Sequence, residues 1–169
     1  MKKFISIIGV IFMIFSFSSA SIKEGDTVPD YRLKADNGKY INISDYKGKW
    51  IILYFYPKDN TPGCTKEAKT FSELYDEFKK YNAVIFGINT DSVKSHQKFK
   101  KKHNLKITLL SDPKGKVAKD FGVRVILGFC HRDTVLINPE GKVEKIYREV
   151  DPEGNPKAIL EFLKSKSNK

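Results

Sequence analysis

The 169-residue sequence has few residues of the kinds that hold small or metal-dependent folds together. Its two cysteines cannot build the dense disulfide framework of a small secreted scaffold. With only three histidines besides, a structural zinc site with four ligands is not expected. Internal repeats, low-complexity stretches and linkers are absent, and hydrophobic residues reach 40%. A disordered or repetitive chain is therefore excluded.

Acidic residues are outnumbered as well. The chain has 31 Lys and Arg against 20 Asp and Glu, a net charge of +11 that raises nucleic-acid binding as a question. The first residues of the chain indicate another explanation, because they have the pattern of an export signal. Lys2 and Lys3 precede an almost wholly apolar run over 4–17, and Ser18-Ser19-Ala20 offers small residues to a signal peptidase. We therefore predict a signal peptide over residues 1–20, cleaved after Ala20.

The predicted cleavage has consequences for location and partners. The apolar run is shorter than the ~20 residues that a membrane span prefers, so no stable membrane association is expected afterwards. An uncleaved anchor helix is the alternative. Loss of Lys2 and Lys3 leaves residues 21–169 as a single exported domain of net charge +9, periplasmic if the source is Gram-negative. An exported protein meets little nucleic acid, so nucleic acid is not an expected partner.

Hydrophobic patterning alternates between strands and helices along the exported chain. Strands are predicted at 31–35, 40–43, 50–56, 83–89, 107–110, 134–137 and 143–147. Helices are predicted at 62–78, 92–103, 117–121 and around 158–163. The apolar runs at 50–56 and 83–89 suit strands buried on both faces. This order predicts an α/β fold of the thioredoxin-like kind, with a mixed central sheet flanked by helices.

Cys64 is the strongest candidate for chemistry. Pro62 suits the first position of the helix that follows the strand at 50–56, and Thr61 suits its N-cap. Cys64 then lies in the first turn, where free backbone N–H groups and the helix dipole favour a thiolate. The alternative is a small buried cysteine that packs as a hydrophobe, and spacing alone does not separate the two.

The residues around Cys64 carry a family resemblance. Pro57, Thr61 and Cys64 form Pro-x-x-x-Thr-x-x-Cys directly after a buried strand. This motif resembles the active site of the peroxiredoxins. The longer string over 54–68, Tyr-Phe-Tyr-Pro-Lys-Asp-Asn-Thr-Pro-Gly-Cys-Thr-Lys-Glu-Ala, is similar to the PrxQ branch, also called bacterioferritin comigratory proteins. The resemblance continues at 89–92, 110–113, 121–123 and 131–137, and so covers nearly all of the exported chain.

The resemblance implies a thiol peroxidase that is monomeric and needs no metal or organic cofactor. It would reduce hydrogen peroxide, and organic hydroperoxides as well, through a Cys64 sulfenic acid, and a thioredoxin-like or other external thiol would recycle it. Thr61 would hydrogen-bond the peroxide, Pro57 would shield the thiolate from water, and Arg132 would stabilise the developing charge. Glu67, one helical turn after Cys64, is expected to orient Arg132 by a charge-assisted hydrogen bond.

One departure from the family pattern concerns the second, resolving cysteine. Many PrxQ-like proteins carry it five residues after the first, where this chain has Lys69, so that intrahelical disulfide is impossible here. Cys130 is the only other thiol. In an extended segment it would point to the same side as Arg132, so a Cys64–Cys130 disulfide is one option. A buried bystander thiol and an intermolecular bridge are the others.

Two further functional hypotheses come from different classes. Thr61-Pro-Gly-Cys64 stands where a thioredoxin-like disulfide carrier has a Cys-x-x-Cys pair, but without its first cysteine the two-thiol exchange fails. A non-enzymatic envelope protein with a structural Cys64–Cys130 disulfide is the other hypothesis. Cys130-His131 resembles a metal pair but lacks a third ligand.

The remaining features are predicted to be structural. The basic run over 98–102, with His96 and His103, is predicted to be a solvated helix face. The aromatic residues at 54–56 are predicted to be strand core, with Tyr54 or Tyr56 in a position to line the site.

Overall fold

The structure, a computed structural model, describes residues 20–168. The predicted signal peptide therefore lies outside the described residues, apart from Ala20. After an irregular lead-in, the elements are β1 (Arg32–Ala35), β2 (Tyr40–Asn42), the 3₁₀ turn η1 (Ile43–Tyr46), β3 (Trp50–Phe55), α1 (Pro62–Glu73), α2 (Tyr75–Lys80), β4 (Ala83–Asn89), α3 (Val93–His103), β5 (Thr108–Ser111), α4 (Lys116–Asp120), β6 (Val125–Ile126), β7 (Phe129–Cys130), β8 (Asp133–Ile137), β9 (Val143–Tyr147) and α5 (Gly154–Ser167).

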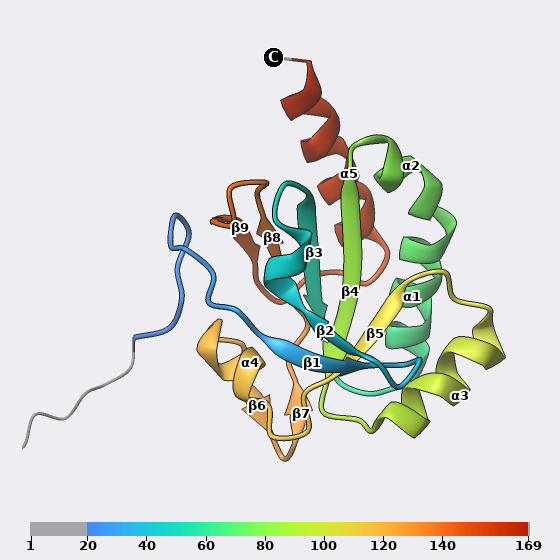
Figure 1. The fold of residues 1–169 in the computed structure, drawn as a ribbon. Coiled ribbons are helices and arrows are strands. Elements are labelled where there is room, and N and C mark those ends of the chain that lie inside the picture. The colour runs from blue at the N-terminus through green and yellow to red at the C-terminus, as the bar shows by residue number, and fades with distance from the viewer. Residues whose placement is uncertain (1–19, 169) are drawn as a thin grey trace, which may run out of the picture.

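Seven strands form one mixed sheet in the order β2-β1-β5-β4-β3-β8-β9 (Figure 1). The central strands β3, β4 and β5 run parallel, and helices provide the crossovers between them. The outer pairs β1–β2 and β8–β9 are antiparallel hairpins. A two-stranded hairpin, β6–β7, lies apart from this sheet. The predicted α/β class with a mixed central sheet is confirmed.

Strand β3 divides the core into two layers. Ile51, Leu53 and Phe55 pack with residues of η1 and α4 on one face. Ile52 and Tyr54 pack with residues of α1, α2, α3 and α5 on the other. Side chains alternate across a strand, so this split follows directly from the continuous apolar run. Each fully buried aliphatic side chain stabilises the fold by about 1.5–3 kcal/mol. The sheet therefore separates the residues of one layer from those of the other.

The functional edge of the sheet is set by the parallel pairing of β3 with β4. Phe55 pairs with Ile88 near the ends of the two strands. The loops that follow them, over 56–61 and 90–92, therefore leave the sheet at the same edge. Helix α1 begins from the first loop and α3 from the second (Figure 1).

Two predictions about elements need correction. The helix predicted over 62–78 is broken at Leu74, whose backbone leaves helical geometry (φ −88°, ψ 2°) and separates α1 from α2. The hairpin β6–β7 was not predicted, because strands of two residues carry too little hydrophobic pattern to be detected.

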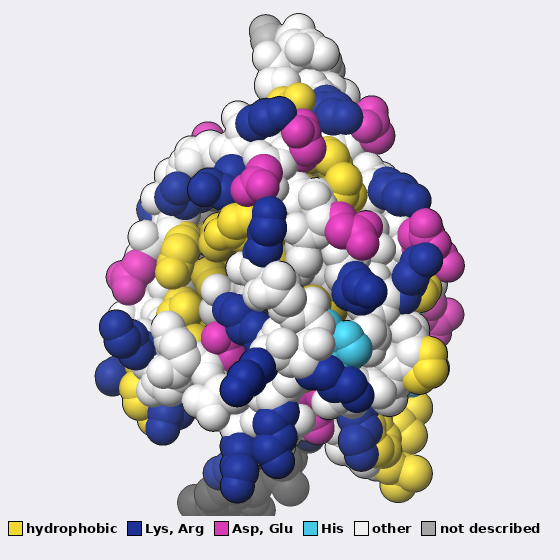
Figure 2. All heavy atoms as spheres, turned by 90° about the vertical axis from the view of Figure 1, so that its right-hand side faces the viewer, with side chains coloured by type: hydrophobic (Ala, Val, Ile, Leu, Met, Phe, Trp, Pro, Cys, Tyr) yellow, Lys and Arg dark blue, Asp and Glu magenta, His cyan; other side chains and the backbone are white. Residues whose placement is uncertain are grey.

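The basic surface is mixed rather than concentrated. Figure 2 shows Lys and Arg side chains over the face that carries the helices α1 to α3, with Asp and Glu between them. Lys100 lies 3.2 Å from Asp36, while Lys98 and Lys101 are exposed. His96 is fully buried, so its prediction as a surface residue is wrong. Within residues 20–168, no helix has both the length and the apolarity to cross a membrane.

We predict that Gly87→Ala destabilises the fold. Gly87 faces Tyr54 across the β3–β4 pairing, and a Cβ there would lie 2.6 Å from the phenol Cζ and Oη and 2.8 Å from Leu109 Cδ2. Overpacking of a core site costs about 1–3 kcal/mol, which urea unfolding measures as a lower free energy of unfolding. Lys101→Ala, an exposed change on α3, is the control and should stay within about 0.5 kcal/mol. Equal stability of Gly87→Ala and the parent chain would contradict the packing described.

Candidate active site

Cys64 is the third residue of α1 and is 1% exposed. The first helical hydrogen bond runs from the Thr65 N–H to the Thr61 carbonyl, at 2.9 Å. The N–H groups of Gly63 and Cys64 therefore have no partner within the helix and concentrate partial positive charge around the thiol. This environment stabilises a negative charge on sulfur, and on any oxygen brought beside it.

Arg132 adds a full positive charge to the same place. It lies in the two-residue link between β7 and β8, and its carbonyl accepts a hydrogen bond from the Val150 N–H at 2.9 Å. Its Nη2 lies 3.4 Å from the Cys64 Sγ and its Nη1 donates to Glu67 Oε2 at 2.5 Å. Its side chain is only 17% exposed. The charge therefore acts on the sulfur with little screening by water.

Glu67 is fully buried on the next turn of α1. Its Oε2 accepts from Arg132, as the sequence led us to expect, and its Oε1 has no hydrogen-bond partner among the described residues. Burial raises the pKa of the carboxyl to about 8, against the lowering effect of the Arg132 charge. Around neutral pH the carboxyl therefore keeps a proton in the folded protein.

Gly63 is a site residue that sequence reasoning missed. A Cβ on it would lie 3.2 Å from Arg132 Nη2, so the guanidinium packs directly over the glycine to reach the sulfur. Glycine is a poor helix former, and its presence in the first turn of a helix was the available signal.

Thr61 and Pro57 lie in the loop that leads into α1. Thr61 occupies the N-cap position, as predicted, with an extended backbone, and its side chain makes no capping hydrogen bond. Its hydroxyl instead donates to the Lys58 carbonyl at 2.9 Å. Its oxygen lone pairs are consequently left to accept a hydrogen bond. Pro57, half-buried, begins the loop directly after the buried Tyr56.

A second buried polar cluster was not found from the sequence. Asp59 lies between Pro57 and Thr61, and its Oδ2 is 2.8 Å from Nδ1 of His96 on α3. The side-chain exposures are 2% and 0%. The signal that could have revealed it was the thin apolar face of α3, where His96 fills a core position.

Cys130 does not converge with Cys64. It packs in the layer that contains Leu53 and Phe55, whereas Cys64 packs in the layer on the other face of the sheet. The inference that Cys130 points the same way as Arg132 is wrong, because residues 131 and 132 are irregular and break the strand alternation. Both cysteines are free thiols. Burial, with smaller contributions from nearby carboxylates, raises the pKa of Cys130 to about 12.

The aromatic residues Tyr54 and Tyr56 pack in the same core layer as Cys64. Tyr54 and Tyr56 are fully buried, and Tyr54 stacks on Phe71 of α1 with ring centroids 4.7 Å apart. Burial raises the pKa of both phenols well above the usual range, so both stay neutral.

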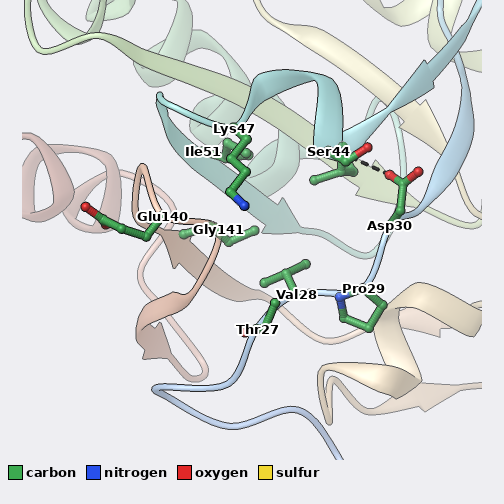
Figure 3. A pocket seen from close by; sticks show the side chains of 11 residues that line it. Thr27, Val28, Pro29, Asp30, Ser44, Lys47, Ile51, Glu140 and Gly141 are labelled. Carbon is green, nitrogen blue, oxygen red and sulfur yellow. Dashed lines mark hydrogen bonds between the residues drawn. The ribbon is translucent and has the colours of Figure 1, made fainter.

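One cavity lies far from Cys64. It has a volume of about 210 Å³ and opens at the opposite end of the sheet, against Val28, Ile51 and Ile137, with Lys47 directed into it (Figure 3). No cysteine or histidine lines it. Over residues 20–168, no three His, Cys, Asp or Glu side chains are grouped to hold a metal ion.

Comparison with known proteins agrees with this geometry. Residues 24–146 match the AhpC/TSA family. Peroxiredoxin Bcp of Bacillus subtilis is 43% identical over 157 aligned residues, which cover 88% of this chain and 99% of that protein. Chloroplastic Peroxiredoxin Q of Suaeda salsa is 42% identical over 149 residues, 86% of this chain and 70% of that protein.

Solved structures agree as well. A cysteine-to-serine mutant of PrxQ from Xylella fastidiosa superposes with a TM-score of 0.82 at 32% identity, over 88% of this chain and 99% of that one. The bacterioferritin comigratory protein of Xanthomonas campestris, whose structure addresses its alkyl peroxide reduction, has a TM-score of 0.76 at 34% identity, over 83% and 99%. The predicted thioredoxin-like fold is thereby confirmed. The chain belongs to the AhpC/TSA family of peroxiredoxins, in the Bcp/PrxQ subfamily, and is a thiol peroxidase.

Proposed function

We propose that Cys64 is the peroxidatic nucleophile and that it reduces hydrogen peroxide and organic hydroperoxides. The observation that carries this is the 3.4 Å contact between Arg132 Nη2 and the Cys64 Sγ at the start of α1. A cation and free N–H groups around one buried sulfur favour the thiolate, which is the reactive form. The alkyl peroxide reduction described for the Xanthomonas relative supports the organic substrates.

The reaction is a displacement at oxygen. The Cys64 thiolate attacks one peroxide oxygen, the O–O bond breaks, and Cys64 becomes a sulfenic acid. The other oxygen leaves with the electron pair and takes a proton, as water from hydrogen peroxide or an alcohol from an organic hydroperoxide. A peroxide is small, so the rate must come from alignment by fixed partners rather than from binding energy.

Each neighbouring group has a defined task in this proposal. The Thr61 hydroxyl donates to the Lys58 carbonyl, so its oxygen accepts the O–H of the peroxide. Arg132 and the Gly63 N–H stabilise the charge that moves onto the leaving oxygen. Pro57 keeps water from the sulfur. Glu67 holds Arg132, and because its own carboxyl is protonated near neutral pH, the guanidinium charge remains available to the sulfur.

We propose that a thiol from outside the chain recycles the enzyme. Cys130 lies across the sheet from Cys64, and Lys69 occupies the place of the intrahelical resolving cysteine. An external thiol would attack the sulfenic acid, releasing water and forming a mixed disulfide. A second thiol would then restore Cys64 and leave the reductant oxidised. A thioredoxin-like protein is one such reductant.

The first test is the intact mass of the fully reduced protein after one equivalent of hydrogen peroxide, followed by rapid unfolding in guanidinium and alkylation of the remaining thiols. We expect Cys64 alone to be lost, with a gain of one oxygen atom, or of one added small thiol when that thiol is present. Cys64→Ser should consume no peroxide. A mass lower by two hydrogens, with neither cysteine alkylated, would instead mean an internal disulfide between Cys64 and Cys130. Reaction no faster than that of free cysteine would overturn the proposed function.

The second prediction concerns Cys130. Its pKa of about 12 leaves little thiolate at pH 8, so iodoacetamide should not modify it in the folded protein. After unfolding in guanidinium, it should react like an ordinary thiol. The Cys64→Ser variant isolates this signal, and Cys130→Ser is its matched control. Rapid alkylation of Cys130 in the folded Cys64→Ser protein would contradict the buried, protonated thiol described here.

The third prediction concerns Glu67→Gln. The unfolded chain releases the Glu67 proton near ~4.3, whereas the folded protein keeps it until about pH 8. When the folded state binds more protons, the free energy of unfolding falls as pH rises. The stability of the parent chain relative to Glu67→Gln should therefore fall between pH 5 and pH 8 in urea titrations. A difference that stays constant or rises would mean that Glu67 is ionised in the folded protein.

A further inference from the structure

The cluster of Asp59 and His96 is not used by the chemistry above, although Asp59 lies in the active-site loop. Oδ2 of Asp59 is 2.8 Å from Nδ1 of His96, and Nε2 of the same ring is 3.2 Å from the Leu110 carbonyl oxygen. Neither the histidine nor the carboxylate reaches solvent appreciably. A buried ionisable pair is costly unless each group is paired and hydrogen-bonded, so this arrangement calls for a physical explanation.

The partners of the ring define its protonation. Both ring nitrogens face acceptors, one a carboxylate and the other a carbonyl. A neutral imidazole has one N–H, so it would leave one nitrogen lone pair against an acceptor in a site without solvent. The Tyr56 hydroxyl also lies at the ring, 3.5 Å from Nδ1, and donates to Asp59 at 2.6 Å. An imidazolium that donates from both nitrogens satisfies every partner.

Asp59 is held from three directions. Its Oδ1 accepts from Tyr56, directly after β3, and its Oδ2 accepts from Ser95 at 2.7 Å as well as from His96, both on α3. Its own N–H donates to Asp91 Oδ2, in the loop after β4, at 2.8 Å. The hydrogen bond from His96 lowers the pKa of the carboxyl despite the opposing effect of burial, so Asp59 is ionised.

These contacts control the shape of the loop that carries the site. Asp59 is the middle residue between Pro57 and Thr61, and the next residue, Asn60, has a left-handed backbone (φ 61°) that few side chains tolerate. Thr61 then closes the turn through its bond to Lys58. With Asp59 anchored, the turn places Thr61 at the start of α1, three residues before Cys64.

We propose that His96 is a positioning residue of the peroxidase: as a buried imidazolium paired with Asp59, it holds the loop over residues 57–61 in the shape that sets Thr61 and Pro57 over the Cys64 sulfur. This rests on the proposed function of Cys64. His96 does not touch the peroxide. It acts on the alignment of the peroxide with the sulfur, and not on the ionisation of the sulfur, which Arg132 and the helix start control.

The protonation is tested first, on the unmodified full chain. Its three histidines are labelled with ¹⁵N, and the ring nitrogens are observed by NMR at pH 8, where ordinary histidines are neutral. We expect one ring, absent from the His96→Asn spectrum, to have two protonated nitrogens. A neutral ring pattern for His96 would overturn the imidazolium. This measurement does not depend on any peroxidase activity.

The positioning role is tested with two rates on each variant: oxidation of Cys64 by hydrogen peroxide and alkylation of Cys64 by iodoacetamide. Alkylation needs the thiolate but not the aligned loop. His96→Leu should lower the peroxide rate by about 10- to 100-fold, as a displacement of aligning groups does. It should leave alkylation within about twofold, since the groups that favour the thiolate are unchanged. His103→Asn, on the same helix but half-buried and away from Asp59, is the matched control and should change neither rate.

His96→Asn is the conservative variant, because its amide can donate to Asp59 in place of Nδ1 without the charge. It should recover part of the peroxide rate lost in His96→Leu, and it keeps the test usable should the leucine variant fold poorly. An unchanged peroxide rate in His96→Leu, or an equal loss in both rates, would overturn the positioning role. A parent chain that reacts with peroxide no faster than free cysteine would overturn the proposed function and this role together, while the NMR result would still decide the protonation.

Discussion

The site depends on bringing one guanidinium against one buried sulfur. Arg132 reaches Cys64 because Gly63 leaves room for its Nη2, and because the link between β7 and β8 is tied to Val150. A cation inside a protein interior acts strongly on a neighbouring anion, yet it is itself costly to bury. Burial is tolerated here because Glu67 accepts from the other side of the guanidinium. The geometry of the active site therefore depends on how the start of α1 and the segment before β8 position this charge.

Two buried polar contacts, each with one cationic partner, lie at the carboxyl edge of the central strands. One joins α1 to the segment before β8 through Glu67 and Arg132, and the other joins the loop over 57–61 to α3 through Asp59 and His96. Buried pairs contribute little net stability compared with apolar packing, but breaking one leaves an uncompensated charge. Their main effect at this edge is on geometry, because each contact holds the two backbone segments that it joins in one arrangement.

The sheet also keeps the two cysteines apart, which affects how oxidised Cys64 can be reduced. Cys64 and Cys130 pack against opposite faces of it, and the buried residues 51–55 of β3 contribute to both of these layers. A structural disulfide between them, considered from sequence, does not exist in this fold. A resolving step inside the chain would require one thiol to leave its core layer, which would expose apolar surface to water. An outside thiol needs only access to the start of α1.

Local patterns in the sequence were enough to predict the α/β class, the buried strands β3 and β4, the helix that begins at Pro62, and the motif of Pro57, Thr61 and Cys64. These features follow from hydrophobic periodicity and from residue types close together in the chain. Tertiary structure alone decided what meets across long separations: Arg132 against Gly63, His96 against Asp59, and the face on which Cys130 lies. Burial, charge pairing and the direction of a side chain after an irregular link depend on neighbours far away in sequence, so no local pattern determines them.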